Sequence, residues 1–120
     1  MSGYIANNVA PMDSIFTNII SDGYFYVQNV TVTLIDDATY NFLSSKTVRY
    51  DVFVKGSDEM AIGIVSPTGV VTMPVNSGTL GWTTTDTDNK YNIYDGGDFG
   101  VLKNRSGATA TFYITLKYRR

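Results

Sequence analysis

Acidic side chains supply the most concentrated groups of potential chemistry in this sequence. Residues 86–89 (Asp-Thr-Asp-Asn) and 95–98 (Asp-Gly-Gly-Asp) carry carboxylate and amide oxygens of the kind that bind Ca²⁺. They do not form an EF-hand pattern, because Lys90 stands where a further oxygen ligand is expected and no bidentate Glu follows. Turns are themselves rich in Asp and Gly, so we expect turns here and no bound metal.

Paired carboxylates could support acid–base catalysis, and two adjacent pairs occur, Asp36-Asp37 and Asp58-Glu59. Neighbouring residues of a strand point to opposite faces, which makes either pair a poor catalytic dyad. The chain contains no His and no Cys, which are the side chains that most often transfer protons near neutral pH or act as thiol nucleophiles. We therefore expect a protein that is not an enzyme and that uses no cofactor.

Aromatic rings offer a third kind of chemistry, the stacking of a bound ligand. Trp82, Tyr91 and Tyr94 could supply the aromatic surface of a carbohydrate-binding (lectin-like) receptor-recognition module. Tyr91 and Tyr94 are three residues apart, however, and so face opposite sides of a regular strand. We expect Trp82 to fill the core or one end of the fold, with ligand stacking as the alternative.

The elements that would position these residues follow from an alternation of apolar and polar side chains. It is clearest over residues 109–118, 48–55 and 30–34, where the period of two is typical of half-buried strands. Shorter strands are expected over residues 24–27, 61–65, 70–75, 79–85, 91–94 and 99–102. Turn-forming segments separate them at residues 66–69, 76–78, 86–89, 95–97 and 104–107. The pattern predicts an all-β fold, an antiparallel two-sheet sandwich of about eight strands and of jelly-roll or immunoglobulin-like type.

The N-terminal part of the chain departs from this pattern. Over residues 12–20, apolar residues recur at the spacing of a short helix, although the β-branched residues among them leave a strand open. Residues 1–11 form a polar extended arm, whose isolated apolar anchors Tyr4, Ile5 and Val9 are suited to contact a neighbouring subunit. The chain is thus divided into this arm and a single sandwich domain over residues 12–120.

Charge is distributed unevenly along the chain, although the formal net charge is only −2. Residues 1–45 contain four Asp and no Lys or Arg, whereas no acid follows Asp98. The basic residues of the final segment are Lys103, Arg105, Lys117, Arg119 and Arg120. Such segregation favours contacts between copies or with an acidic partner, so Lys103, Arg105, Arg119 and Arg120 are candidate partner-binding residues. We expect no nucleic-acid partner, because basic residues do not alternate with aromatic ones along a strand.

The hydrophobic stretches indicate neither export nor membrane insertion. The first eight residues have neither the positive nor the apolar region of a secretory signal. No apolar stretch approaches the roughly 18 residues of a membrane helix. We expect a protein that is not secreted and has no membrane partner.

In these features the chain resembles small virion proteins of tailed bacteriophages, nearest to capsid decoration (cement) proteins and head-fibre or tail-associated sandwiches. The resemblance extends over the chain: no Cys or His, abundant Thr, Asn, Gly and Tyr, an arm at residues 1–11 and a Thr-alternating strand at residues 108–118. It implies a non-enzymatic virion protein, assembled in the host cytoplasm, that forms a homo-oligomer with a trimer favoured. The implied partners are the major capsid protein or other virion subunits, with the arm adding a strand to a capsid sheet.

Overall fold

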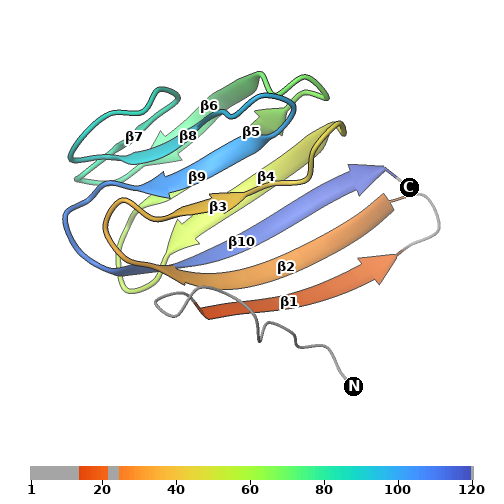
Figure 1. Cartoon of the computed structure of the whole chain (residues 1–120). Helices are drawn as coiled ribbons and strands as arrows, with labels where there is room; N and C mark the ends of the chain where they lie inside the picture. Colours follow the sequence, from red (N-terminus) through yellow and green to blue (C-terminus); the bar gives the residue numbers. More distant parts are fainter. Residues whose placement is uncertain (1–13, 22–24, 120) are drawn as a thin grey trace.

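The structure, a computed structural model, describes residues 14–21 and 25–119, with side chains from residue 25 onward. These residues form ten β-strands in two layers (Figure 1). In chain order the strands are β1 (Ser14–Ser21), β2 (Phe25–Leu34), β3 (Thr39–Asn41), β4 (Val48–Val54), β5 (Met60–Val65), β6 (Val71–Ser77), β7 (Trp82–Thr83), β8 (Tyr91–Asp95), β9 (Gly100–Asn104) and β10 (Ala110–Arg119). No helix occurs within the described ranges, and so none that is long and apolar enough to cross a membrane.

The two layers are a six-stranded sheet in the order β1-β2-β10-β4-β5-β6 and a four-stranded sheet in the order β3-β9-β8-β7. β2 pairs with β10 in the first sheet, while β3 and β9, which lie between them in the sequence, pair in the second. Folding one strand pair over another in this way resembles a jelly roll. The predicted all-β two-sheet sandwich is confirmed.

The hydrophobic core lies between the two sheets. Along β4, β10 and the second half of β2, every second residue is buried, as the period of two predicts. Aromatic rings join the layers: the ring centroids of Phe42 and Tyr50 are 5.7 Å apart, and those of Tyr91 and Phe112 are 5.6 Å apart. The opposite face of the six-stranded sheet, called the outer face below, is not covered by the second sheet (Figure 1).

Residues 14–21 form a strand, so the short helix expected near residues 12–20 is wrong for this part of the segment. β1 pairs antiparallel with β2 along its whole length, from Ser14 opposite Thr33 to Ser21 opposite Tyr26. A two-turn helix is marginal on its own, whereas β-branched residues favour a strand that finds backbone partners on β2. Residues 12 and 13, like the arm at residues 1–11, lie outside the described residues.

Three details of the strands differ from the sequence-based expectations. Residues 25–34 form one continuous strand, because both halves pair with β10 in an unbroken register. The strand expected over residues 79–85 is reduced to β7, which pairs with β8 in parallel, the one departure from antiparallel pairing among the described strands. The sequence pattern does not predict β3, because three residues are too few to show an alternation.

Candidate functional site: a cationic groove on the six-stranded sheet

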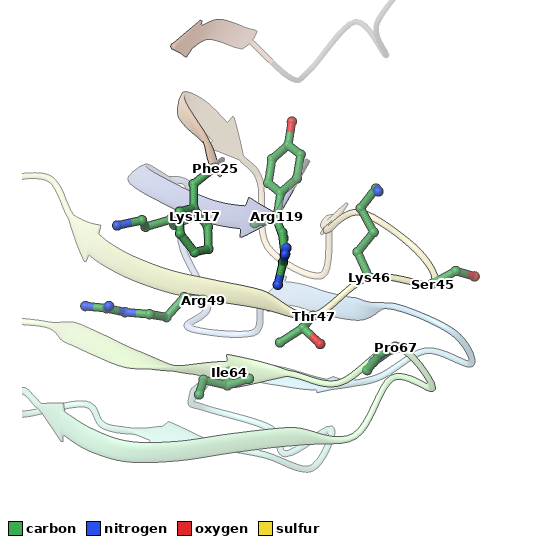
Figure 2. A pocket seen from close by; sticks show the side chains of 10 residues that line it. Phe25, Ser45, Lys46, Thr47, Arg49, Ile64, Pro67, Lys117 and Arg119 are labelled. Carbon is green, nitrogen blue, oxygen red and sulfur yellow. The ribbon is translucent and has the colours of Figure 1, made fainter. Parts of the chain in front are cut away.

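A groove of about 550 Å³ lies at one end of the outer face, within the size range of small ligand-binding sites. Figure 2 shows that its lining side chains come from several neighbouring strands and from the loops beside them. The lining residues are Phe25, Ser45, Lys46, Thr47, Arg49, Ile64, Pro67, Lys117, Tyr118 and Arg119. Four of these ten are cationic and none is acidic.

The register of the sheet brings the cations together. Arg49 of β4 lies directly opposite Lys117 of β10 on one side and Ile64 of β5 on the other. Arg119 follows Lys117 by two residues and so lies on the same face of β10, directly opposite Phe25 of β2. Arg49 thus joins Lys117 and Arg119, which are distant from it in sequence, in one continuous patch, and Lys46, from the loop before β4, completes it.

These four cations have no acidic partner within the part of the chain that the structure describes: the ion pairs there all involve Lys103 or Arg105. Asp51, which shares the outer face of β4 with Arg49, forms no ion pair with it. Like charges directly opposite one another weaken a sheet, so the Arg49–Lys117 pair is unfavourable unless an anion binds. Among the described residues, the positive charge of the groove is therefore uncompensated.

The floor of the groove is apolar. Phe25 and Ile64 are 38% and 44% exposed, and the Nζ atom of Lys117 lies 5.0 Å from the centroid of the Phe25 ring, in a cation–π contact. Tyr118 is buried beneath the groove with its ring 5.5 Å from that of Tyr26. Burial, together with Tyr26, raises the pKa of Tyr118 above that of an ordinary tyrosine, so its phenol is neutral. The groove thus combines apolar contact with positive charge.

A second group of cations, Lys103 and Arg105, has a different environment. Lys103 Nζ lies 3.2 Å from Asp86 Oδ2, and the Arg105 guanidinium lies 3.3 Å from Asp37, 3.3 Å from Asp86 and 3.5 Å from Asp88. Desolvation pulls the pKa of Arg105 down, but the charges of Asp88, Asp86 and Asp37 more than offset it and raise the pKa on balance. We call these five residues the Arg105 cluster; its charges are compensated within the chain.

Several of the acidic residues considered for chemistry make structural contacts. Asp37, Asp86 and Asp88 belong to the Arg105 cluster, and no group of three acidic side chains among the described residues could hold a metal ion. Glu59 is 4% exposed and accepts hydrogen bonds from the backbone N–H groups of Leu80 (2.6 Å) and Gly81 (3.2 Å). This carboxylate fixes the loop before β7, whereas its neighbour Asp58 is exposed.

The aromatic residues proposed for ligand stacking lie mostly in the core. Trp82 and Tyr91 are 7% and 8% exposed, and their ring centroids are 5.1 Å apart. Tyr94, three residues further along β8, is half-buried. Trp82 and Tyr91 pack on each other, and Tyr91 also packs on Phe112, so these two buried rings present no flat surface to solvent.

The predicted partner-binding residues are separated by the fold. Arg119 lines the groove, Lys103 and Arg105 belong to the Arg105 cluster, and Tyr4, Ile5, Val9 and Arg120 lie outside the described residues. The sequence prediction missed Phe25, Lys46, Arg49 and Ile64, and it placed Lys117 in the basic C-terminal segment without naming it as a partner-binding residue. Arg49, Ile64 and Lys117 occupy outward-facing positions of strands, which the apolar–polar alternation can indicate. Only the strand register shows that these residues are neighbours.

Comparisons of the chain with protein-family models, with curated proteins and with solved structures find no match. The function must therefore be argued from the groove and the outer face themselves.

Proposed function

We propose that this chain is a non-enzymatic structural subunit of a virion, of the capsid-decoration kind, that binds an acidic surface of a neighbouring virion protein through its outer face. The observation that carries the proposal is the groove, where four cations without an acidic partner among the described residues surround apolar side chains. The resemblance to small phage virion proteins supplies the kind of assembly.

The outer face has the composition of a docking surface. Of the six large apolar side chains that are exposed among the described residues, five belong to strands of the six-stranded sheet, and these are Phe25, Phe53, Ile64, Val75 and Tyr113. Phe53 and Tyr113 lie directly opposite each other on β4 and β10. Aromatic residues and arginine are enriched at protein interfaces, and clustered apolar side chains on a surface favour a protein partner.

Charge favours an acidic partner over a second copy bound through the same face. Beside the four groove cations, the described strands of the six-stranded sheet contain a single acidic residue, Asp51 of β4. Two copies that met through this face would bring eight cations together, and like charges across an interface oppose association. An acidic partner instead compensates the charge and relieves the Arg49–Lys117 repulsion.

Zero-length cross-linking with a carbodiimide, which joins amines to carboxylates, tests this proposal on particles purified from the organism that produces the chain. We expect the chain to be present in the particles and Lys46 or Lys117 to be joined to an acidic residue of another virion protein. Lys103 serves as the internal control, because its ammonium group lies 3.2 Å from Asp86 and should form an intrachain link. Absence of the chain from the particles, or links to other proteins through other lysines only, would overturn the proposal.

A further inference from the structure

We infer that the groove binds an extended acidic peptide segment, with carboxylates at two alternate positions and an apolar residue at the next alternate position. This inference rests on the proposed function, because it describes the segment that the partner would present. The spacing of the cations and the chemistry of the lining favour a peptide ligand over an anionic sugar or a nucleic acid.

The spacing of the cations matches that of alternate side chains in an extended peptide. Lys117 and Arg119 are two residues apart on β10, which places their Cα atoms roughly 7 Å apart. Side chains at positions i and i+2 of an extended ligand are separated by the same distance and point to the same side. Arg49 lies directly opposite Lys117, about 5 Å away between Cβ atoms, so the first carboxylate can contact two cations at once.

Apolar surface continues on both sides of these cations. Phe25 lies opposite Arg119 on β2, and Ile64 lies opposite Arg49 on β5. Both side chains are more than a third exposed. An apolar residue two positions from a carboxylate can therefore bury its side chain against Phe25 or Ile64 while the acids remain paired.

The lining fits a peptide better than an anionic sugar or a nucleic acid. No Asn, Gln, Asp or Glu lines the groove, and Ser45 and Thr47 are its only aliphatic hydroxyls. Sugar sites depend on such polar groups and on an open aromatic ring that stacks on the sugar. Single-stranded nucleic-acid sites likewise depend on aromatic rings that stack on the bases. Here Lys117 already lies over the ring of Phe25, and Tyr118 is buried.

Binding of synthetic probes to the full chain tests the inference. The patterned peptide Ac-Thr-Glu-Thr-Glu-Thr-Leu-Thr-NH₂ is compared by calorimetry with a peptide of the same composition whose two Glu are adjacent. A sulfated heparin hexasaccharide and an eight-nucleotide DNA strand are the competing anions. We expect the patterned peptide to bind at least about tenfold more tightly than the other three. Equal binding of the two peptides, or tighter binding of either competing anion, would overturn it.

Variants locate the binding. Arg49→Glu with Lys117→Glu should abolish binding of the patterned peptide, and a peptide with Lys in place of both Glu should bind this variant instead. Arg49→Gln with Lys117→Gln is the milder pair, which removes the opposed charges without adding new ones. Lys55→Glu is the matched control, because Lys55 is exposed just beyond β4 and does not line the groove. Loss of binding in Lys55→Glu, or retention in both groove variants, would contradict the inference.

The two proposals can fail separately. Cross-links from Lys46 or Lys117 to a virion protein without peptide selectivity would retain the proposed function and reject the peptide pattern. Selective peptide binding by a chain that is absent from particles would retain the groove as a peptide site and reject the virion role.

Discussion

The groove and the Arg105 cluster use the same kinds of residue in opposite ways. Both combine arginine with lysine, and both draw on the basic C-terminal segment: the cluster uses Lys103 and Arg105, and the groove uses Lys117 and Arg119. In the cluster three aspartates compensate the charge. In the groove the described residues provide no compensating acid, and two cations face each other across neighbouring strands.

Compensation by nearby acids, rather than basic character, separates structural cations from those available to a partner. The Arg105 guanidinium joins acids from the loop after β2 and from the loop between β7 and β8, so it ties together segments distant in sequence. The groove cations form no ion pair with another described residue, and the opposed Arg49–Lys117 pair slightly destabilises the sheet that carries it. A cost of this kind is expected where a surface is kept for binding.

The largest expected effect is a loss of stability at high pH, because a buried tyrosine lies next to each of the two regions. Burial raises the pKa of Tyr118 under the groove and of Tyr91 next to the Arg105 cluster, where Ser106 opposes the shift and Glu59 adds to it. Because the folded state keeps these protons to higher pH than the unfolded chain, the stabilisation is complete below the unfolded pKa of about 10 and is lost as the pH rises through the folded pKa. The free energy of unfolding should fall by up to about 1.4 kcal/mol per pH unit per tyrosine above pH 10.

Urea unfolding between pH 8 and pH 11 measures this loss. Tyr50, whose pKa burial also raises, should contribute in the same direction. Tyr118→Phe and Tyr91→Phe should each make the decline shallower. A free energy of unfolding that stays constant up to pH 11 would show that the phenols are not held protonated by the fold.

Charge reversal should then separate the two regions by their effect on stability. Arg105→Glu would place a fourth acid among Asp37, Asp86 and Asp88, so it should lower the melting temperature clearly. Arg119→Glu, the matched reversal in the groove, removes a charge that pairs with no acid among the described residues and should leave the melting temperature nearly unchanged. Differential scanning calorimetry gives both values, and equal losses in the two variants would remove the distinction between the regions.

The smallest expected effect is the repulsion within the groove itself. A double-mutant cycle of Arg49→Thr and Lys117→Thr should give an unfavourable coupling free energy of about 0.2–1 kcal/mol between the two cations. Each Thr substitution also changes the strand propensity at its own position, and the cycle cancels these separate contributions. Denaturant unfolding at low salt measures the coupling, and a favourable value would mean that the opposed cations do not repel each other in the sheet.

Much of the fold was predictable from the sequence, because the alternation along β4, β10 and the second half of β2 reports directly which residues face the core. Residues 14–21 were ambiguous, since the same residues satisfy both a helical period and a strand, and pairing with β2 decides between them. The two-residue strand β7 is held by the packing of Trp82 on Tyr91, a contact between residues that no local pattern connects.

The candidate site was predictable only in part. The basic C-terminal segment pointed to Arg119, but its division between the groove and the Arg105 cluster depends on which acids the loops bring near. Arg49 and Lys117 are 68 residues apart and become neighbours only through the pairing of β4 with β10. Register between distant strands is the information that a periodic pattern lacks.

The assignment of the groove as the binding site is tested most directly by a nuclear magnetic resonance titration of the full chain with the patterned acidic peptide. One titration follows both the groove and the Arg105 cluster. Side-chain resonances of the arginine Nε–H and lysine Nζ groups report each cation separately. We expect saturable shifts at Arg49, Lys117 and Arg119, with Lys103 and Arg105 unchanged. Shifts that are strongest at Lys103 and Arg105, or no saturable shift at the groove, would contradict the assignment of the groove as the binding site.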